Sequence, residues 1–367
     1  MQSCDLVNRY LRPHSPSAFL RVVIEKPFGN DFDSAVALAH DIRKILQNDE
    51  VLLMDHYAGK MGIRGIASFF ERNQAVLAPI WNDLFIQSID IHMTETETCE
   101  HRLEFFHDVG IIRDVMVNHL QLVLGSVTSL SCSGSNCQND HLRFIQSMKQ
   151  SGQVVLGQYE GYAHGNHELS ETFAATAALI GFISGHDQWK QTRFTISAAK
   201  ATQQRRLQVR VRLNQKTHSR EPPCDVRFVV HEGSGSSGER IELNCTSFRH
   251  VSPPQGWEAV ETEESTLLRP AATNQEKKSW ELGNTLSAYD FLLAEAVAGN
   301  HHQHFMNLDQ VLAAWKLWTP IVKIAEQVDP AAPEHEDDIK QVVRYAIGAE
   351  EWTYSATTRA PSSHEDL

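Results

Sequence analysis

The chain has 367 residues, of which 41% are apolar and 22% are charged, so it can bury the cores of about two domains and is neither disordered nor fibrous. Its 46 Asp and Glu residues exceed its 33 Lys and Arg residues, and the net charge of −13 has the wrong sign for a protein that binds along a nucleic acid. No apolar run approaches the ~18–20 residues that span a bilayer, so we expect no membrane insertion.

The first half of the chain alternates strand and helix patterns. Residues 19–24 (FLRVVI) predict a short strand that Pro27 and Gly29 terminate. Residues 33–46 repeat apolar side chains at helical spacing behind two possible N-caps, Asp31 and Asp33. We expect further elements in this order: an apolar stretch over 51–58, a helix over 62–80, a strand over 86–93, a helix over 110–124, a loop over 126–140 and a strand over 154–159.

The second half begins with strands and ends with helices. Alternating apolar residues between 192 and 250 predict four strands separated by polar turns. Helices are expected over 287–299 and 308–326, followed by an acidic linker at 329–338 and a disordered polar tail at 355–367.

One glycine motif imitates a dinucleotide-binding loop. Residues 233–238 (GSGSSG) match GxGxxG, but they lead into the alternating strand 240–248 and not into a helix. Without a helix N-terminus there are no free N–H groups to hold a pyrophosphate, so the motif predicts a hairpin loop.

Cysteines and histidines give weak signals of compartment or metal. The first twenty residues lack the apolar segment of a signal peptide, and the six cysteines form no CxxC pair. Cys132 and Cys137 are close enough for a local disulfide, and the sequon at Asn244 mildly favours a secretory compartment. The triplet His301-His302-x-His304 is a weak candidate metal site; surface histidines are usually solvated, so we expect no metal.

The chemistry-bearing residues gather in three segments. These are Glu25-Lys26-Pro27, Asp55-His56-Tyr57-x-Gly59-Lys60 and Arg113-Asp114-x-x-x-Asn118-His119. Each polar group alone is more often a satisfied core residue. Together they offer cations for a phosphate and a carboxylate–imidazole pair for proton transfer. On a regular α-helix Asp114 and His119 point ~140° apart, so the partner of His119 is expected elsewhere, with Asp55 the best candidate.

At these residues the sequence resembles the glucose-6-phosphate dehydrogenase family. EKPFG at 25–29, DHYAGK at 55–60 and GIIRDVMVNHL at 110–120 are similar to its most recognisable segments, and the likeness continues to AAWKLWTP at 313–320. The WTP ending and the HEGSGSSGERIEL stretch at 231–243 are nearer to the luminal branch, hexose-6-phosphate dehydrogenase of the endoplasmic reticulum.

The resemblance implies roles for individual residues. His119 would be the general base at the sugar C1 hydroxyl while hydride passes to NADP, and Asp55 would orient it. Lys26 would lie between substrate and nicotinamide. The remaining substrate contacts would come from His56, Tyr57 and Lys60 at the 6-phosphate and from Glu95, Asp114 and Lys200. The segment around Lys200 departs from the family pattern GKALNERK, with Ala199 in place of Gly and Arg206 in place of the second Lys, and Ala58 replaces the usual Leu.

The resemblance also implies an architecture. We expect an α+β fold with a large antiparallel sheet over 55–328, preceded by the last strand and helix of a Rossmann-type NADP-binding domain at 1–54 and followed by a linker and tail at 329–367. Family members carry a Gly-rich coenzyme loop before EKPFG, whereas only 24 residues precede it here. The sequence therefore reads as N-terminally truncated, and the chain as given is expected to be inactive. A homodimer through the sheet is implied as well.

Two functions remain open. The first is an NADP-dependent hexose-6-phosphate dehydrogenase that makes 6-phosphogluconolactone, the first step of the pentose phosphate pathway. The second is a non-catalytic pseudo-enzyme that binds sugar phosphates or oligomerises. The sub-branch favours the endoplasmic reticulum lumen, with the cytoplasm as the alternative.

Overall fold

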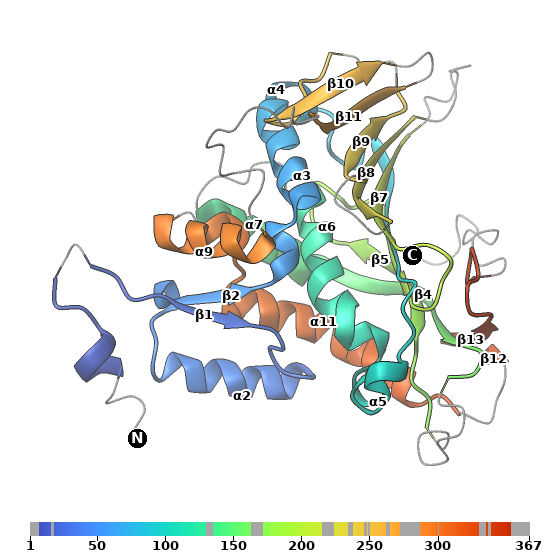
Figure 1. The fold of residues 1–367 in the computed structure, drawn as a ribbon, viewed down its shortest axis with the longest axis horizontal. Helices are drawn as coiled ribbons and strands as arrows, with labels where there is room; N and C mark the ends of the chain where they lie inside the picture. Colours follow the sequence, from blue (N-terminus) through green and yellow to red (C-terminus); the bar gives the residue numbers. More distant parts are fainter. Residues whose placement is uncertain are drawn as a thin grey trace.

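Eleven described strands form one large sheet whose helices pack on one side (Figure 1). The computed structural model describes residues 7–15, 18–129, 135–162, 172–214, 224–233, 238–245, 248, 250–261, 265–271, 287–299, 301–329, 335–336 and 339–353. The strand order is β10-β11-β9-β8-β7-β3-β6-β5-β4-β13-β12. The strands are β3 (Ile86–Thr94), β4 (Met148–Tyr159), β5 (Ala177–Ser184), β6 (Arg193–Ala199), β7 (Arg206–Leu213), β8 (Asp225–Glu232), β9 (Arg240–Leu243), β10 (Trp257–Glu261), β11 (Thr266–Pro270), β12 (His335–Glu336) and β13 (Lys340–Tyr345).

The N-terminal segment forms the predicted strand and helix, and a second strand follows them. β1 (Val22–Glu25) and β2 (Val51–Met54) pair in parallel, and α2 (Phe32–Arg43) connects them. α2 begins at Asp31, whose carboxylate accepts a hydrogen bond from the Ser34 amide at 2.8 Å. This unit lies beside the helices, away from the large sheet (Figure 1). Two short helices flank it: η1 (Val7–Leu11) and η2 (Asn48–Glu50).

The helices cover the inner face of the large sheet. α3 (Met61–Arg72) packs on β8, α11 (Leu308–Glu326) packs on β4, and η5 (Ile112–Leu120) packs on β6. The other described helices after β2 are η3 (His56–Gly59), α4 (Gln74–Leu77), η4 (Glu100–Arg102), α5 (Leu103–Ile111), α6 (Gln121–Thr128), α7 (Ser135–Ser147), α9 (Ala288–Ala298) and α10 (His301–His304).

α11 anchors the loop that carries the first chemical motif. The Trp315 indole donates to the Phe28 carbonyl at 2.9 Å, and the Thr319 hydroxyl accepts from the Phe32 amide at 2.9 Å. Trp318 is fully buried and donates to Gln121 at 2.9 Å. The WTP segment therefore holds the 25–32 loop against the helical layer.

The α+β expectation is confirmed, but three details of it are wrong. The sheet is mixed, because β3 pairs with β6 and β13 pairs with β4 in parallel. The segment 329–367 is not only linker and tail, since β13 joins the sheet and Trp352 is buried over Gly157. Residues 135–140, expected in a loop, begin helix α7. The predicted tail at 355–367, Cys132 and the side chain of Cys137 lie outside the described part of the chain.

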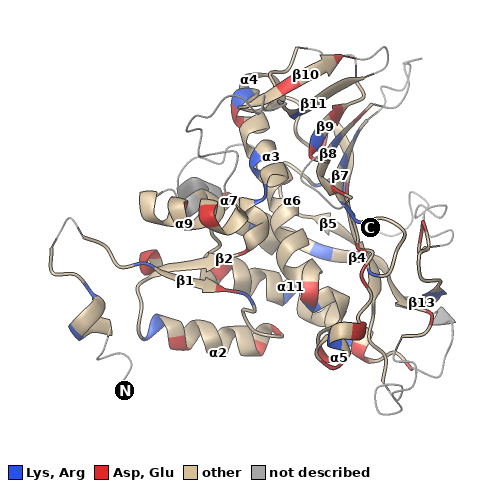
Figure 2. Ribbon diagram, viewed as in Figure 1, with Lys and Arg blue, Asp and Glu red and all other residues tan. Residues whose placement is uncertain are grey.

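The strands β7, β8 and β9 carry charged residues of both signs (Figure 2). Arg210 and Arg227 pair with Asp225, and Arg240 pairs with Glu232 and Glu242. β8 and β9 are antiparallel neighbours, so the pairing expected of the predicted hairpin is present, while residues 234–237 between them lie outside the described part of the chain. A disulfide joins Cys224 to Cys245, with the Cα atoms 5.0 Å apart, and the sequence analysis did not foresee it.

Candidate active site

A buried carboxylate–imidazole pair lies at the centre of the site. Asp55 follows β2 and caps η3, so its Oδ1 accepts from the Tyr57 amide at 2.9 Å. The same oxygen lies 2.6 Å from Nδ1 of His119, and the two residues are 1% and 3% exposed. Burial raises the pKa of Asp55, but the attraction of His119 and the hydrogen bonds outweigh it, and the pKa lies below its ordinary value. The predicted pairing of Asp55 with His119 is present.

Lys26 lies against the other nitrogen of His119. Its Nζ is 2.7 Å from Nε2 and donates to the Asp114 carbonyl at 3.0 Å. Because Asp55 accepts the Nδ1 hydrogen, we assign the Nε2 lone pair to the side facing Lys26. Burial lowers the pKa of Lys26, and the carboxylates of Asp55 and Asp114 oppose that shift. A lone pair oriented in this way can accept a proton.

The helix that carries His119 is not the regular α-helix expected over 110–124. Gly110 adopts a φ of +65°, which kinks the helix at this position. Residues Ile112–Leu120 then form a π-helix with i→i+5 hydrogen bonds. The ~140° separation of Asp114 and His119 therefore rested on the wrong helix geometry. The Asn118 side chain donates to the carbonyls of Arg113 and Asp114, which stabilises the wider turn.

A second cluster brings Glu95, Lys200 and Asp114 together. β3 and β6 are parallel with Thr94 opposite Ala199, so the residues that follow both strands emerge at the same edge of the sheet. The Lys200 ammonium pairs with Glu95 and lies 3.4 Å from Asp114, while Arg102 lies 2.8 Å from Asp114. Burial raises the pKa of Asp114, but these cations lower it by more. Hydroxyl-binding groups of both signs thus lie near Lys26.

The third cluster is cationic. The Lys60 ammonium lies 3.5 Å from the centroid of the Tyr57 ring, and that ring stacks on His119 at 4.1 Å. His56 meets His119 edge-on at 4.9 Å. Burial and the Arg205 charge lower the pKa of Lys60 to about 8; burial and His119 lower that of His56 to about 4. A desolvated ammonium at Lys60, with the imidazole of His56 beside it, suits a phosphate group.

Two contributors to this cluster were missed at the sequence level. Arg205 acts electrostatically on Tyr57 and Lys60, and its only sequence signal is its place five residues after Lys200. Tyr289 of α9 stacks on His56 at 5.7 Å and donates to Glu25. No local pattern links residue 289 to the DHY segment.

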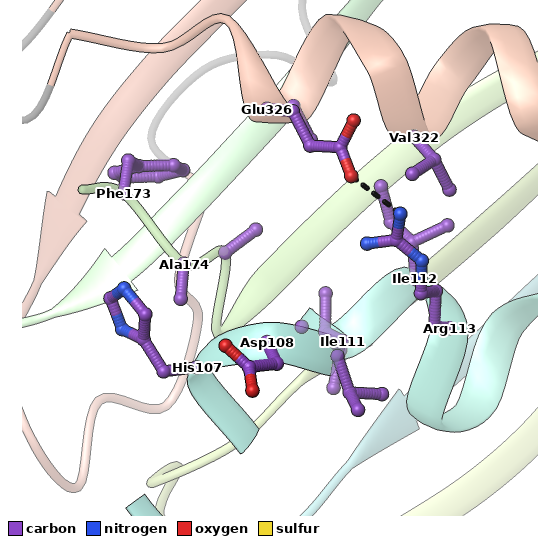
Figure 3. Close-up of a pocket in the computed structure, with 13 residues that line it drawn as sticks. His107, Asp108, Ile111, Ile112, Arg113, Phe173, Ala174, Val322 and Glu326 are labelled. Carbon is purple, nitrogen blue, oxygen red and sulfur yellow. Dashed lines mark hydrogen bonds and ion pairs between the residues drawn. The ribbon is translucent and has the colours of Figure 1, made fainter. Parts of the chain in front are cut away.

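Arg113, by contrast, serves the scaffold. It donates to the Asn30 carbonyl and pairs with Glu326 of α11, beside a cavity of about 70 Å³ lined also by His107 and Asp108 (Figure 3).

Ligand atoms of Asp55, His56 and His119 lie within 4.8 Å of one another and could approach a cation. The side chains of His301 and His302 lie outside the described residues.

The chain matches two family models along nearly its whole length. The glucose-6-phosphate dehydrogenase C-terminal domain matches residues 69–366, and the NAD binding domain of the same family matches residues 4–64. The chain belongs to the glucose-6-phosphate dehydrogenase family.

Curated relatives of the family come from several compartments. The chain is 29% identical to the rabbit GDH/6PGL endoplasmic bifunctional protein, covering 89% of the chain and 44% of that protein. It is 28% identical to the chloroplastic glucose-6-phosphate 1-dehydrogenase of spinach, covering 88% and 57%. The chain thus spans about half the length of the curated relatives it matches.

A solved structure of a glucose-6-phosphate dehydrogenase in complex with its substrate glucose-6-phosphate shares this fold, with a TM-score of 0.72 and 23% identity over 97% of this chain and 70% of that one. Among the described helices of the present chain, none has the length and apolarity needed to cross a membrane.

Proposed function

We propose that this site binds a hexose 6-phosphate and takes the proton from its C1 hydroxyl while C1 loses hydride to NADP. The observation that carries the proposal is the buried Asp55–His119 pair, whose Nε2 faces Lys26 a few ångströms from the cationic cluster. The phosphate would lie by His56, Lys60 and Arg205, and the sugar hydroxyls by Glu95, Asp114 and Lys200.

The proton step follows from this geometry. When the C1 hydroxyl replaces the Lys26 ammonium at Nε2, His119 accepts its proton, and the Asp55 carboxylate stabilises the imidazolium. Tyr57 fixes the plane of the ring by stacking on it, and it fixes the carboxylate by its backbone amide. The residues are thus held before substrate arrives.

The described residues fit only part of the coenzyme. NADP supplies the hydride acceptor, and Lys26 is the one residue assigned to it. The N-terminus of α2 does not suit a pyrophosphate, because the Asp31 carboxylate accepts the Ser34 amide, the Thr319 hydroxyl accepts the Phe32 amide, and Asp33 adds a second negative charge. The second candidate function is sugar-phosphate binding without turnover, which needs no contact with the pyrophosphate.

Two readouts separate these functions. In titration calorimetry, glucose 6-phosphate should bind the chain, glucose should bind far more weakly, and Lys60→Ala should lose the phosphate-dependent part, whereas the exposed Lys190→Ala should behave like wild type. Reduction of NADP, with a loss of about 10²–10⁴-fold in His119→Asn and little change in sugar affinity, supports the dehydrogenase. Binding of glucose 6-phosphate without reduction of NADP supports the second function. If glucose 6-phosphate binds neither the wild type nor any variant, both functions are contradicted.

Compartment and assembly complete the proposal. We place the protein in an oxidising lumen, supported by the Cys224–Cys245 disulfide and the endoplasmic relatives. We also propose a homodimer through the charged outer face of the sheet, where the paired arginines and carboxylates of β7–β9 offer complementary contacts. Light scattering at high and low salt tests the dimer.

A further inference from the structure

A β-bulge turns His231 toward the cationic cluster. In the β7–β8 pair, Val209 faces Phe228 and Gln208 faces Val229, but Leu207 faces His231, so Val230 is left without a partner. Opposed residues of an antiparallel pair point to the same face of the sheet. His231 therefore shares the helix-covered face with Leu207 and Val209, whereas regular alternation from Phe228 would place it on the outer face.

Helix α3 packs closely against this bulge. A Cβ at Gly62, in the first turn of α3, would lie 2.6 Å from the Cα of Val230, so the backbone of α3 approaches the bulge directly. This close contact brings the preceding residues Tyr57 and Lys60 next to His231. The Tyr57 and His231 rings meet edge-on at 6.3 Å.

His231 is buried without a hydrogen-bond partner among the described residues. It is 9% exposed, and neither Nδ1 nor Nε2 has a donor or acceptor within reach. Two unpaired ring nitrogens in a buried site cost free energy in the absence of a ligand. The charged groups that face this region are Lys60, Arg205 and, beyond Lys60, Glu239, while Glu232 points to the outer face with Arg240. Burial and the two cations lower the pKa of His231 to about 3.

We infer that His231 is a proton-coupled ligand of the sugar phosphate: it is neutral in the free protein and becomes an imidazolium when a dianion binds between it, Lys60 and Arg205. The dianion cancels the charges of Lys60 and Arg205, which lower the pKa of His231 in the free protein, and offers an acceptor to the unpaired ring nitrogens. The proton comes from solvent, so binding consumes it and the affinity falls as pH rises. This inference rests on the proposed phosphate site.

Nuclear magnetic resonance of histidine-labelled protein tests the inference, with the His231 signal assigned by its loss in His231→Gln. At pH 7, glucose 6-phosphate should move this signal from the neutral to the imidazolium position. Sulfate, which stays a dianion throughout this range, should do the same. Calorimetry in buffers of different ionisation enthalpy should show fewer protons taken up by His231→Gln than by wild type.

The outcomes separate this inference from the proposed function. If ligand binds, the His231 signal stays at its neutral position and proton uptake is equal in both proteins, then the inference is overturned and the phosphate site stands. If neither glucose 6-phosphate nor sulfate binds, the proposed function falls first. Glutamine keeps a hydrogen-bond donor of similar length, so a merely structural role for His231 would leave the proton count unchanged.

Discussion

The affinity of the site for a dianion should fall steeply between pH 7 and pH 9 because Lys60 loses its charge there. Burial and the neighbouring Arg205 lower the pKa of Lys60 to about 8. With that value, about nine-tenths of the chains carry the ammonium at pH 7 and about one-tenth at pH 9. If only the charged form binds the phosphate, the loss of the Lys60 charge alone raises the apparent dissociation constant by about ten-fold over this interval, and His231→Gln isolates this contribution from the proton uptake of His231.

Sulfate titration by calorimetry at constant ionic strength measures this change without any titration of the ligand. Lys60→Arg provides the matched control, because a guanidinium stays charged over the whole range and can also lie over the Tyr57 ring. The comparison is made in the His231→Gln background, which removes the proton uptake of His231, and there Lys60→Arg should make the affinity change far less with pH. An affinity of His231→Gln that is flat from pH 7 to pH 9, or an equal fall when Lys60→Arg is added, would refute the assignment of Lys60.

Two further predictions concern stability. Gly59→Ala places a Cβ 2.3 Å from the Ala288 carbonyl at the start of α9, so urea denaturation should show a loss of about 1–3 kcal/mol, whereas Gly185→Ala, with its nearest neighbour at 3.7 Å, should be near neutral. Reduction of the Cys224–Cys245 disulfide, whose cysteines are 21 residues apart, should lower the free energy of unfolding by about 3 kcal/mol. The double variant Cys224→Ser, Cys245→Ser should be equally destabilised and insensitive to reductant; if wild type does not respond to reductant, the bond does not stabilise the fold.

Local sequence patterns predict the parts of the site that lie at the end of a strand. Asp55 follows an apolar strand and caps a short helix, so its position could be read from DHYAGK alone. The partner of His119 was identified by excluding Asp114, yet the helix there is π-helical, so that argument reached the right residue from a wrong geometry. The roles of His119 as general base and of Asp55 as its orienting partner are implied by the family resemblance, and they remain predictions.

Other parts depend on tertiary contacts that no short pattern contains. His231 reaches the site only because a bulge shifts the β7–β8 register, and alternation alone would place it outside. β13 follows an acidic Pro/Ala segment whose composition predicts a linker, but β13 pairs in parallel with β4 and so joins the sheet. Residues 135–140 belong to a Ser/Gly/Asn/Cys-rich stretch whose composition predicts a loop, and packing of the 135–147 segment against α11 stabilises it as helix α7.

The most direct test of the proposed site is a crystal structure of the chain with glucose 6-phosphate. The account predicts the phosphate among His56, Lys60 and Arg205, and the C1 oxygen at Nε2 of His119 in the place that Lys26 occupies in the free protein. A phosphate bound outside this cluster, or a sugar whose C1 points away from His119, would contradict it.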